Sequence, residues 1–568
     1  MQSPQAVVDQ RQTLLSLAVI KCDVMPMYSP TPQSDPDGRA QEALLRGLMN
    51  PRSYPHEVAA IERIETHIST VLLTGRYAYK IKKPVDLGFL DFTSLAARRH
   101  FCEEELRLNR RLAPGLYLDV VAICGTPDAP RVSSGEAQDA IEYAVKMKQF
   151  PQSGLLDHML TRGELTPSQV DALARIVAAF HAAAARAGGE DPYGAPASVE
   201  GQMRQNFTQI RSLPALTGAG IKIDELERWS LAQHTALTPL MAQRKSEGFV
   251  RECHGDLHLG NIALADGEIQ IFDCIEFNPD LSWTDVAAEI GFLLMDFAAR
   301  ARPDLGARFL NAYLEISGDY ACVRLLPYYL VYRALVRAKV AGIRSHQPGI
   351  TASQCAAALT EFAAHLDLAH AFTRKPQPCL MITRGVSGSG KTTVTQPLVE
   401  HTGKLGALRL RSDIERKRLY GLPGAARSHS AVDAGLYTED ASRQTYDELY
   451  CLARLLIEAG WPVIVDASFL QRSQRNHLRA LADEMRAPFL VLDCHAEADE
   501  LRRRVAQREA AGSDASEATL AVLERQLETA EPVAADERGY TLSIDTQHDD
   551  LRQFSRQVCV RLGLAVRE

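Results

Sequence analysis

Two carboxylates and an amide in the middle of the chain have the spacing of a phosphoryl-transfer site. Asp256 and Asn261 are five residues apart in the segment His254–Asn261, and Asp273 follows Asn261 by twelve residues. In such an arrangement the Asp256 carboxylate accepts the proton of an attacking hydroxyl, while Asn261 and Asp273 hold Mg²⁺ against the phosphates of ATP. The simpler interpretation is an ordinary hairpin rich in Asp and Asn.

The residues that follow this segment predict the strands that would bring the three groups together. Ile262–Leu264 leads out as a strand, Asp266-Gly267 is a strong hairpin turn, and Ile269–Phe272 returns. The return strand ends at Asp273, so we expect this carboxylate to lie beside the segment that contains Asp256.

A lysine on a strand is expected to complete the same site. The run from Arg76 to Lys82 predicts a strand, and Lys80 and Lys82 share one of its faces because side chains alternate along a strand. In kinase-like folds a strand lysine paired with a helix glutamate fixes the α- and β-phosphates of ATP. We expect Lys80 to be this lysine, with Lys82 as the alternative.

The glutamate would come from a long helix predicted over residues 94–112. Glu105 is the preferred partner because its seven-residue step to Leu112 keeps it on the apolar face of the helix. Glu103 is the second choice.

The predicted elements change in kind after Phe150-Pro151, where a strand over residues 140–149 ends and helices begin. We expect a hinge here between a β-rich lobe and a helical lobe, with backbone groups that hold adenine. The helices are predicted at residues 170–185, 285–296, 303–316, 328–342 and 351–371. His181, in the first of them, is expected to be a core or interlobe histidine.

Taken together, these features over residues 55–370 resemble the aminoglycoside phosphotransferase branch of the protein-kinase-like superfamily. The resemblance implies a bilobal α+β kinase-like domain that uses ATP and Mg²⁺. It also implies that Asp256 is the catalytic base, that Asn261 and Asp273 are metal ligands, and that His254 supports the loop. One departure is the turn at residues 65–69, which lacks a G-x-G-x-x-G loop, so another backbone arrangement must cover the phosphates.

A second phosphate site is predicted further along the chain. A buried-type strand over residues 379–383 runs into a complete G-x-x-x-x-G-K-[ST] loop, whose backbone N–H groups can wrap phosphates at a helix N-terminus. Lys391 would neutralise the β- and γ-phosphate oxygens, and Thr392 would coordinate Mg²⁺. The expected nucleotide-binding residues are Gly385, Ser387, Gly388, Ser389, Gly390, Lys391, Thr392 and Thr393.

Four more strands, over residues 408–413, 463–466, 489–493 and 540–544, predict an open parallel sheet around this loop. Asp466 ends one of them and is placed to hold the Mg²⁺ water. The helix over residues 498–509 carries four arginines, which would either close over ATP or form a solvated basic face.

Residues 378–568 resemble P-loop kinases of the polynucleotide 5′-kinase, zeta-toxin and gluconate-kinase type, and so imply an α/β domain with a parallel sheet. The resemblance implies that Asp413 activates the acceptor and that Arg504 and Arg508 belong to a lid. The order of the two domains along the chain resembles that of bacterial two-domain proteins described as aminoglycoside-phosphotransferase-like and ATP-binding.

Length and composition predict a soluble chain with two domains or three. The chain has 568 residues, 46% hydrophobic and 24% charged, with a net charge of −8 that disfavours a mainly electrostatic nucleic-acid binder. Eleven cysteines without framework spacing predict reduced thiols in the cytoplasm. The expected organisation is a poorly ordered leader (1–40), a kinase-like domain (41–372), a linker (373–378) and a P-loop domain (379–568).

The sequence therefore predicts an ATP-dependent kinase, bifunctional if both domains act, with a small-molecule hydroxyl acceptor and no membrane partner. One alternative is an ATP sensor in which the P-loop domain gates the kinase-like domain. The other is a nucleic-acid 5′-end kinase in the C-terminal half, suggested by the basic segment 409–418.

Overall fold

The computed structural model describes residues 36–87, 90–133, 138–213, 220–347, 349–375, 377–424, 426, 438–511 and 516–565. These form two compact units: the first contains the described residues up to 166 with 180–299 and 327–373, and the second contains 167–179, 300–326 and the described residues from 374 onward. Most of the expected leader (1–40) lies outside the described residues, and helix α2 (Pro36–Leu48) begins within it.

The first unit contains a six-stranded antiparallel sheet in the order β1-β2-β3-β6-β4-β5. Its apolar face packs on α2 through Leu72, Tyr79 and Ile81. Lys80 and Lys82 alternate with Tyr79 and Ile81, so they point to the other face, toward helix α3. The elements are β1 (Glu62–Glu65), β2 (Ser69–Leu73), β3 (Tyr77–Lys82), α3 (Leu95–Asn109), β4 (Tyr117–Thr126), β5 (Ala129–Val132) and β6 (Ala140–Lys148), with the 3-10 turn η1 (Pro51–Ser53) before them.

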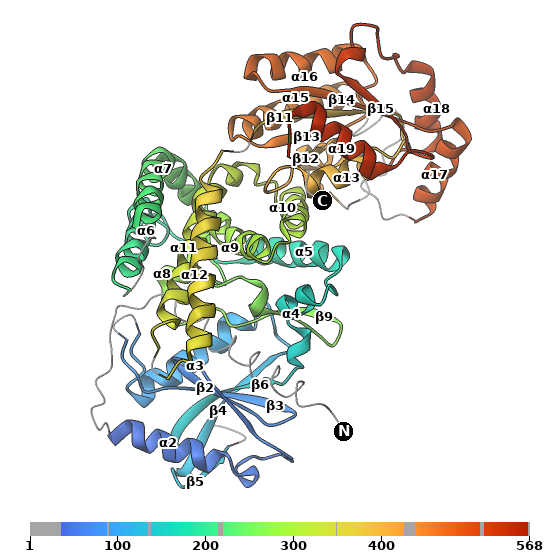
Figure 1. Ribbon diagram of the computed structural model, residues 1–568. Coiled ribbons are helices and arrows are strands. Elements are labelled where there is room, and N and C mark those ends of the chain that lie inside the picture. The colour runs from blue at the N-terminus through green and yellow to red at the C-terminus, as the bar shows by residue number, and fades with distance from the viewer. Residues whose placement is uncertain are drawn as a thin grey trace. The chain divides into compact units, whose positions relative to one another are not determined.

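The rest of the first unit is mainly helical (Figure 1). Two antiparallel strand pairs, β7 with β10 and β8 with β9, flank the segment that contains Asp256. The elements are η2 (Gln152–Gly154), α4 (Leu156–Thr161), α6 (Pro196–Arg211), α7 (Gly220–Ser246), β7 (Val250–Glu252), η3 (Leu259–Asn261), β8 (Ile262–Ala265), β9 (Glu268–Ile271), α8 (Pro279–Ser282), β10 (Trp283–Asp285), α9 (Val286–Ala299), α11 (Leu326–Arg344) and α12 (Ala352–Phe372). Helix α5 (Pro167–Ala183) is divided between the two units.

The second unit is built on a five-stranded parallel sheet in the order β12-β13-β11-β14-β15, with helices on both faces (Figure 1). The central strands are buried and almost continuously apolar, as expected for a parallel sheet covered on both sides. The strands are β11 (Cys379–Arg384), β12 (Leu408–Arg411), β13 (Pro462–Asp466), β14 (Phe489–His495) and β15 (Thr541–Asp545). The helices are α10 (Pro303–Ser317), η4 (Tyr320–Arg324), α13 (Lys391–His401), α14 (Ser412–Leu419), α15 (Glu439–Glu458), α16 (Arg472–Met485), α17 (Ala498–Ala511), α18 (Leu520–Thr529), η6 (Arg538–Tyr540) and α19 (Leu551–Leu562).

None of the helices in the described part of the chain combines the length and the apolar character needed to cross a lipid bilayer. The described cysteines are all free thiols.

Candidate active sites

A cluster of buried charges lies between β3 and α3 in the first unit. Lys80 Nζ donates to Glu105 Oε1 and to Asp273 Oδ1, both at 2.6 Å. Lys82 Nζ donates to Glu105 Oε2 at 2.8 Å and to Glu276 Oε1 at 2.5 Å. The two carboxylate oxygens of Glu105 are thus divided between the two lysines. Burial would lower the pKa of Lys80, but Asp273, Glu105 and Glu276 outweigh it, so the pKa lies well above its usual value.

The two lysines and the two glutamates that the sequence left as alternatives lie in different environments. Lys80 lines a cavity of about 90 Å³ together with Val71, Met147 and Phe272, whereas Lys82 is fully buried behind it. The same cavity is lined by Phe150 at the expected hinge and by Thr66 in the turn between β1 and β2. Glu105 is completely buried, while Glu103 is exposed and pairs with Arg99 on the outer face of α3.

The loop of residues 254–261, called the Asp256 loop below, holds its polar side chains in a fixed arrangement. Asp256 is 1% exposed, and its Oδ2 accepts a hydrogen bond from Asn261 Nδ2 at 3.0 Å. His258 Nε2 lies 3.5 Å from the same oxygen. Asp256 Oδ1 is buried without a hydrogen-bond partner among the described residues. Burial would raise the pKa of Asp256, but the interactions with His258 contribute most to holding the pKa below its usual value.

Backbone contacts join this loop to Asp273. His254 Nε2 lies 2.8 Å from the carbonyl oxygen of Phe272, and His254 Nδ1 accepts the N–H of Asp256, so the imidazole spans the two segments. Burial lowers the pKa of His254 to about 4, which keeps the ring neutral. The N–H of Phe272 donates to Asn261 at 3.0 Å, and Asp273 follows with a φ of 68°. A positive φ is uncommon outside glycine and is a local strain of the kind found at functional sites.

Two acidic residues of α9, which the sequence analysis did not single out, support the Asp256 loop. Glu289 accepts the backbone N–H groups of His254 (2.7 Å) and Gly255 (3.1 Å), and Asp296 accepts that of Leu259 (2.9 Å). The sequence contained a signal for this supporting role. Glu289 and Asp296 are acidic residues in an otherwise apolar helix, and their seven-residue spacing places them on one face. Burial raises the pKa of Glu289, although Arg333 and the two N–H donors oppose the rise.

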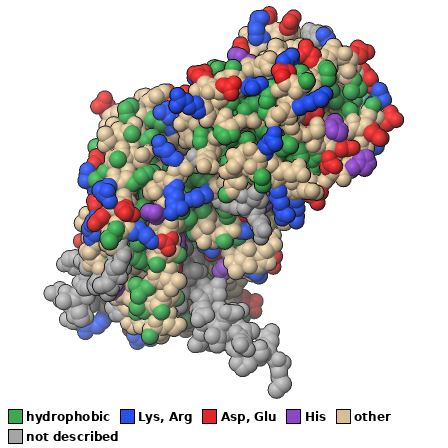
Figure 2. All heavy atoms as spheres, turned by 45° about the horizontal axis from the view of Figure 1, so that its top comes forward, with side chains coloured by type: hydrophobic (Ala, Val, Ile, Leu, Met, Phe, Trp, Pro, Cys, Tyr) green, Lys and Arg blue, Asp and Glu red, His purple; other side chains and the backbone are tan. Residues whose placement is uncertain are grey.

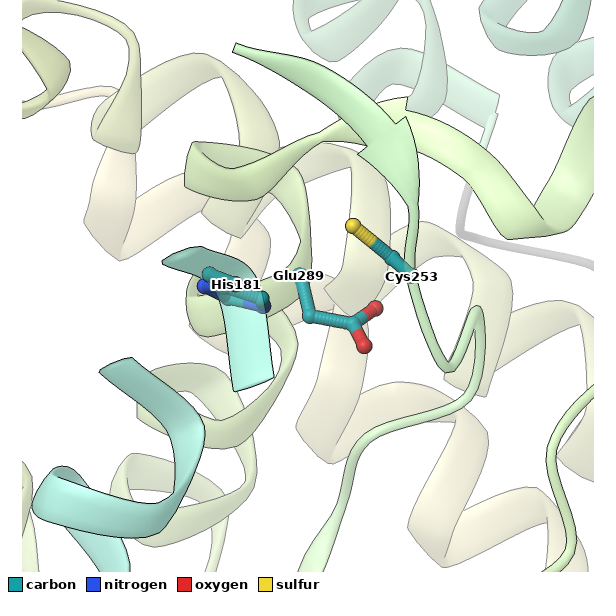
Figure 3. Close-up of side chains that lie close together, drawn as sticks. All are labelled: His181, Cys253 and Glu289. Atoms are coloured by element: carbon teal, nitrogen blue, oxygen red, sulfur yellow. The ribbon is translucent and has the colours of Figure 1, made fainter. Parts of the chain in front are cut away.

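The carboxylate of Glu289 also lies near two other buried side chains, His181 of α5 and Cys253 at the end of β7 (Figure 3). The nitrogen, sulfur and oxygen atoms of the three residues lie within 4.8 Å of one another. Burial lowers the pKa of His181 to about 3 and raises that of Cys253, so both side chains are neutral at neutral pH. Because Glu289 is already bound to two backbone N–H groups, His181 and Cys253 act as packing behind the Asp256 loop.

Replacing Glu289 by glutamine should therefore destabilise the first unit by about 1–3 kcal/mol, because the carboxamide leaves one buried backbone N–H without an acceptor. Urea unfolding followed by the fluorescence of Trp229 and Trp283 would measure this loss in a Trp461→Phe background. The matched control is Glu268→Gln on β9, an exposed position that should change stability by no more than about 0.5 kcal/mol. Equal stability of the two variants would contradict the supporting role.

In the second unit, the glycine-rich segment connects β11 to α13. Gly385 has a φ of 151°, and a Cβ atom there would lie 2.4 Å from Ser389 Oγ and 2.5 Å from the carbonyl oxygen of Cys494. Only glycine fits such a position. Lys391 Nζ folds back over the loop and donates to the carbonyl oxygens of Gly385 and Val386, both at 2.9 Å. Burial lowers the pKa of Lys391.

The polar groups expected around this loop line one cavity of about 860 Å³. Thr392 Oγ1 donates to Asp466 Oδ2 at 2.7 Å, because β13 lies beside β11 in the sheet. Asp413 lines the same cavity, but from the first turn of α14, since β12 ends at Arg411. The strand therefore ends two residues earlier than the sequence predicted.

The arginines of α17 separate into two groups. Arg504 and Arg508 line the cavity, and Arg504 donates to Thr546 Oγ1 at 2.8 Å. Arg502 and Arg503 pair with carboxylates on the exposed side of the helix. A residue that the sequence analysis missed, Gln526 of α18, accepts the N–H of Ser387 at 2.7 Å; the sequence contains no signal for this long-range contact.

Residues 300–326 complete the second unit at strand β12. Asn311 of α10 donates through Nδ2 to the carbonyl oxygen of Ala407 (3.0 Å), and its Oδ1 accepts the N–H of Arg409 (2.8 Å). Tyr320 donates its hydroxyl to Glu415 of α14 at 2.7 Å. Because β12 is an edge strand, these contacts cover backbone groups that would otherwise lack a partner.

Two family models match the chain, one over the Asp256 loop and the other over the glycine-rich loop. Residues 97–326 match the family model "Phosphotransferase enzyme family", and residues 380–533 match the model "AAA domain". The uncharacterized protein Rv2004c of Mycobacterium tuberculosis is 32% identical over 459 residues, which cover 81% of this chain and 88% of that protein. Among solved structures, the amicoumacin kinase hAmiN is 14% identical with a TM-score of 0.36, covering 58% of this chain and 93% of its own. A sugar kinase of Janibacter sp. HTCC2649 is 21% identical with a TM-score of 0.24, covering 34% and 96%.

The folds and sites define a protein with an N-terminal kinase-like phosphotransferase domain and a C-terminal P-loop kinase domain. The chain belongs to the two-domain family, aminoglycoside-phosphotransferase-like followed by P-loop ATP-binding kinase, that includes the mycobacterial protein.

Proposed function

We propose that this protein transfers the γ-phosphate of ATP to hydroxyl acceptors at two sites, one in each unit. The observation that carries the proposal is the contact of Lys80 with both Glu105 and Asp273 at a mainly apolar cavity. This contact joins a phosphate-binding cation to a metal-binding carboxylate at a place where a purine ring would fit.

In the first unit, Asp256 is the general base. It accepts the proton of the acceptor hydroxyl as the oxygen bonds to the γ-phosphorus and the bond from that phosphorus to the bridging oxygen of ADP breaks. Asn261 uses its Nδ2 to bind Asp256, so its side-chain oxygen Oδ1 can join Asp273 in an all-oxygen donor set suited to Mg²⁺. When bound, the metal neutralises charge on the transferring phosphates. Lys80, held by Glu105, orients the α- and β-phosphates.

In the second unit, the backbone of residues 385–390 surrounds the phosphates, and Lys391 turns from its two carbonyl partners toward the β- and γ-oxygens. The Thr392 hydroxyl and the Asp466 carboxylate, already in contact, provide the oxygen donors for Mg²⁺. Asp413 accepts the proton of the acceptor, and Arg504 and Arg508 stabilise the charge of the transferring group.

Small molecules are the proposed acceptors in both units. Four of the five cations in segment 409–418 are bound to carboxylates: Arg409 and Arg411 to Glu315, Lys417 to Glu517 and Arg418 to Glu415. The fifth, Arg416, is buried and donates a hydrogen bond to Ser442. On the visible face of the molecule, basic and acidic side chains are interspersed (Figure 2). Neither feature favours a nucleic-acid backbone as partner.

Transfer from γ-labelled ATP into a small-metabolite extract tests the proposal, with wild type, Asp256→Asn and Lys391→Ala compared. We expect each variant to lose a different labelled product, with the rate falling about 10²–10⁴-fold when the base is removed. Asp266→Asn and Lys375→Ala, at exposed positions, are the matched controls. Loss of all products in one variant would show that one site gates or feeds the other. ATP binding without any labelled product would overturn phosphotransfer in favour of a nucleotide sensor.

A further inference from the structure

Arg333 of α11 is a buried cation without an ionic partner among the described residues. Only 5% of its surface is exposed, its Nε has no hydrogen-bond acceptor, and none of the described carboxylates forms an ion pair with it. Two other buried arginines are bound to carboxylates: Arg244 to Asp285 and Arg475 to Glu537. An unpaired buried charge is costly, so such a group normally has a counter-charge.

The guanidinium of Arg333 is fixed beside the Asp256 loop by aromatic rings. It lies 4.6 Å from the ring centroid of Phe292 and 5.4 Å from that of Tyr332. The other neighbour of the Phe292 ring is the imidazole of His258, at 5.4 Å. The charge of Arg333 lowers the pKa of both Asp256 and Glu289, so it lies within electrostatic range of the proposed base.

Two of the acidic groups near Arg333, Glu289 and Asp285, are already bound by other donors. Glu289 accepts two backbone N–H groups, and Asp285 is bound by Arg244 through two hydrogen bonds. Arg333 also lines a small cavity of about 20 Å³, roughly one water molecule in size, with polar groups of Gln202 and Thr284. Asp280, at the rim of this cavity, is exposed to solvent.

We propose that the acceptor of the first unit is an alcohol that also carries an oxyanion, a carboxylate or a phosphate, and that Arg333 binds this oxyanion. This inference rests on the phosphotransfer proposed above. The hydroxyl lies at Asp256, which takes its proton while the hydroxyl oxygen bonds to the γ-phosphorus and ADP leaves. The oxyanion takes no part in the bond changes and serves to orient the acceptor.

The same charge excludes cationic acceptors. An aminoglycoside or a quaternary amine would place its positive charge near a buried guanidinium that forms no close ion pair with a described carboxylate, and like charges in a dry environment repel strongly. The acceptor class therefore differs from the one that the name of the phosphotransferase branch suggests.

The test compares matched acceptors with the full-length Lys391→Ala protein, so that transfer comes from the first unit. The pairs are glycerate with glycerol, gluconate with sorbitol and glucose 6-phosphate with glucose, and kanamycin is the cationic acceptor. Release of ADP gives kcat and KM. We expect the anionic member of at least one pair to be preferred about 10–100-fold in kcat/KM, the range of a hydrogen bond to a charged group.

Arg333→Gln should abolish that preference mainly through KM, and Arg333→Lys should restore part of it. Arg337→Gln, one helical turn further along α11 and paired with Glu361, is the matched control that should keep the preference. A preference of the Lys391→Ala protein for neutral or cationic acceptors would overturn the inference. An equal loss of kcat/KM for both members of every pair in Arg333→Gln would also overturn it, because Arg333 would then act only on the pKa of Asp256.

Binding separates failure of this inference from failure of the phosphotransfer proposal. If no acceptor is turned over, the same anions are titrated calorimetrically into the protein loaded with AMP-PNP and Mg²⁺. Anion binding that is weakened about 10-fold or more by Arg333→Gln, but not by Arg337→Gln, supports the site without catalysis. Absence of Arg333-dependent binding for every anion of the set would overturn it.

Discussion

Replacing Glu105 by glutamine should destabilise the first unit by about 3–5 kcal/mol, the range for removing one partner of a buried ion pair. Glu105 is completely buried and is the shared partner of Lys80 and Lys82. A carboxamide would place its NH₂ group against one ammonium and leave the cluster with one more positive charge. Transfer at the first site should be lost together with stability, because Lys80 would no longer be held toward the phosphates.

Glu103→Gln is the matched control on the same helix. Glu103 is exposed and pairs with Arg99 four residues earlier, a contact that solvent screens and that contributes little to stability. Urea unfolding in the Trp461→Phe background measures both variants. A double variant, Glu105→Gln with Lys82→Met, should recover neither stability nor activity, because it also breaks the buried ion pair of Lys82 with Glu276 and does not restore the orientation of Lys80. A Glu105→Gln protein as stable as the control would show that the two lysines do not depend on this carboxylate.

The sequence predicted the parts of each site that are encoded locally. The phosphate loop is a continuous backbone motif, and the hairpin around Asp266-Gly267 is specified by its own turn, so both were found without tertiary information. The face shared by Lys80 and Lys82 follows from strand alternation. Alternation could not show that both lysines bind Glu105, because that depends on how α3 packs on the sheet.

Features that depend on distant partners were missed for the same physical reason. Glu289 was inside a helix that the sequence predicted, but its role depends on backbone N–H groups 34 and 35 residues earlier in the chain. Arg333 lies within the helix predicted over residues 328–342, but its lack of an ion pair with any described carboxylate is visible only in three dimensions. Strands β4 and β5 were not predicted, although β4 pairs with β6 in the centre of the sheet.

The second prediction with a large effect on stability concerns Asn311, whose side-chain amide forms hydrogen bonds with the backbone at edge strand β12. Replacing it by leucine, similar in size, should destabilise the second unit by about 2–6 kcal/mol, because two buried backbone groups, the N–H of Arg409 and the carbonyl of Ala407, each lose a hydrogen bond at a cost of about 1–3 kcal/mol. The damage should reach the proposed acceptor base, since β12 leads directly into the first turn of α14 and Asp413. We therefore expect a higher KM for the acceptor of the P-loop site in any protein that remains folded.

Trp461 provides a reporter for this prediction, because it is buried in the second unit and its Nε1 donates to the carbonyl oxygen of Val323 at 3.4 Å. Urea unfolding followed by Trp461 fluorescence, with Trp229 and Trp283 replaced by phenylalanine, measures the stability of that unit. Ile316→Ser, at an exposed position on the same helix, should change it by no more than about 0.5 kcal/mol. If Asn311→Leu unfolds at the same urea concentration as Ile316→Ser, then α10 only touches β12 and the P-loop domain is complete without residues 300–326. If it unfolds earlier, a segment within the matched phosphotransferase region is needed to hold the P-loop kinase fold, and cutting the chain at residues 373–378 would not yield two independent enzymes.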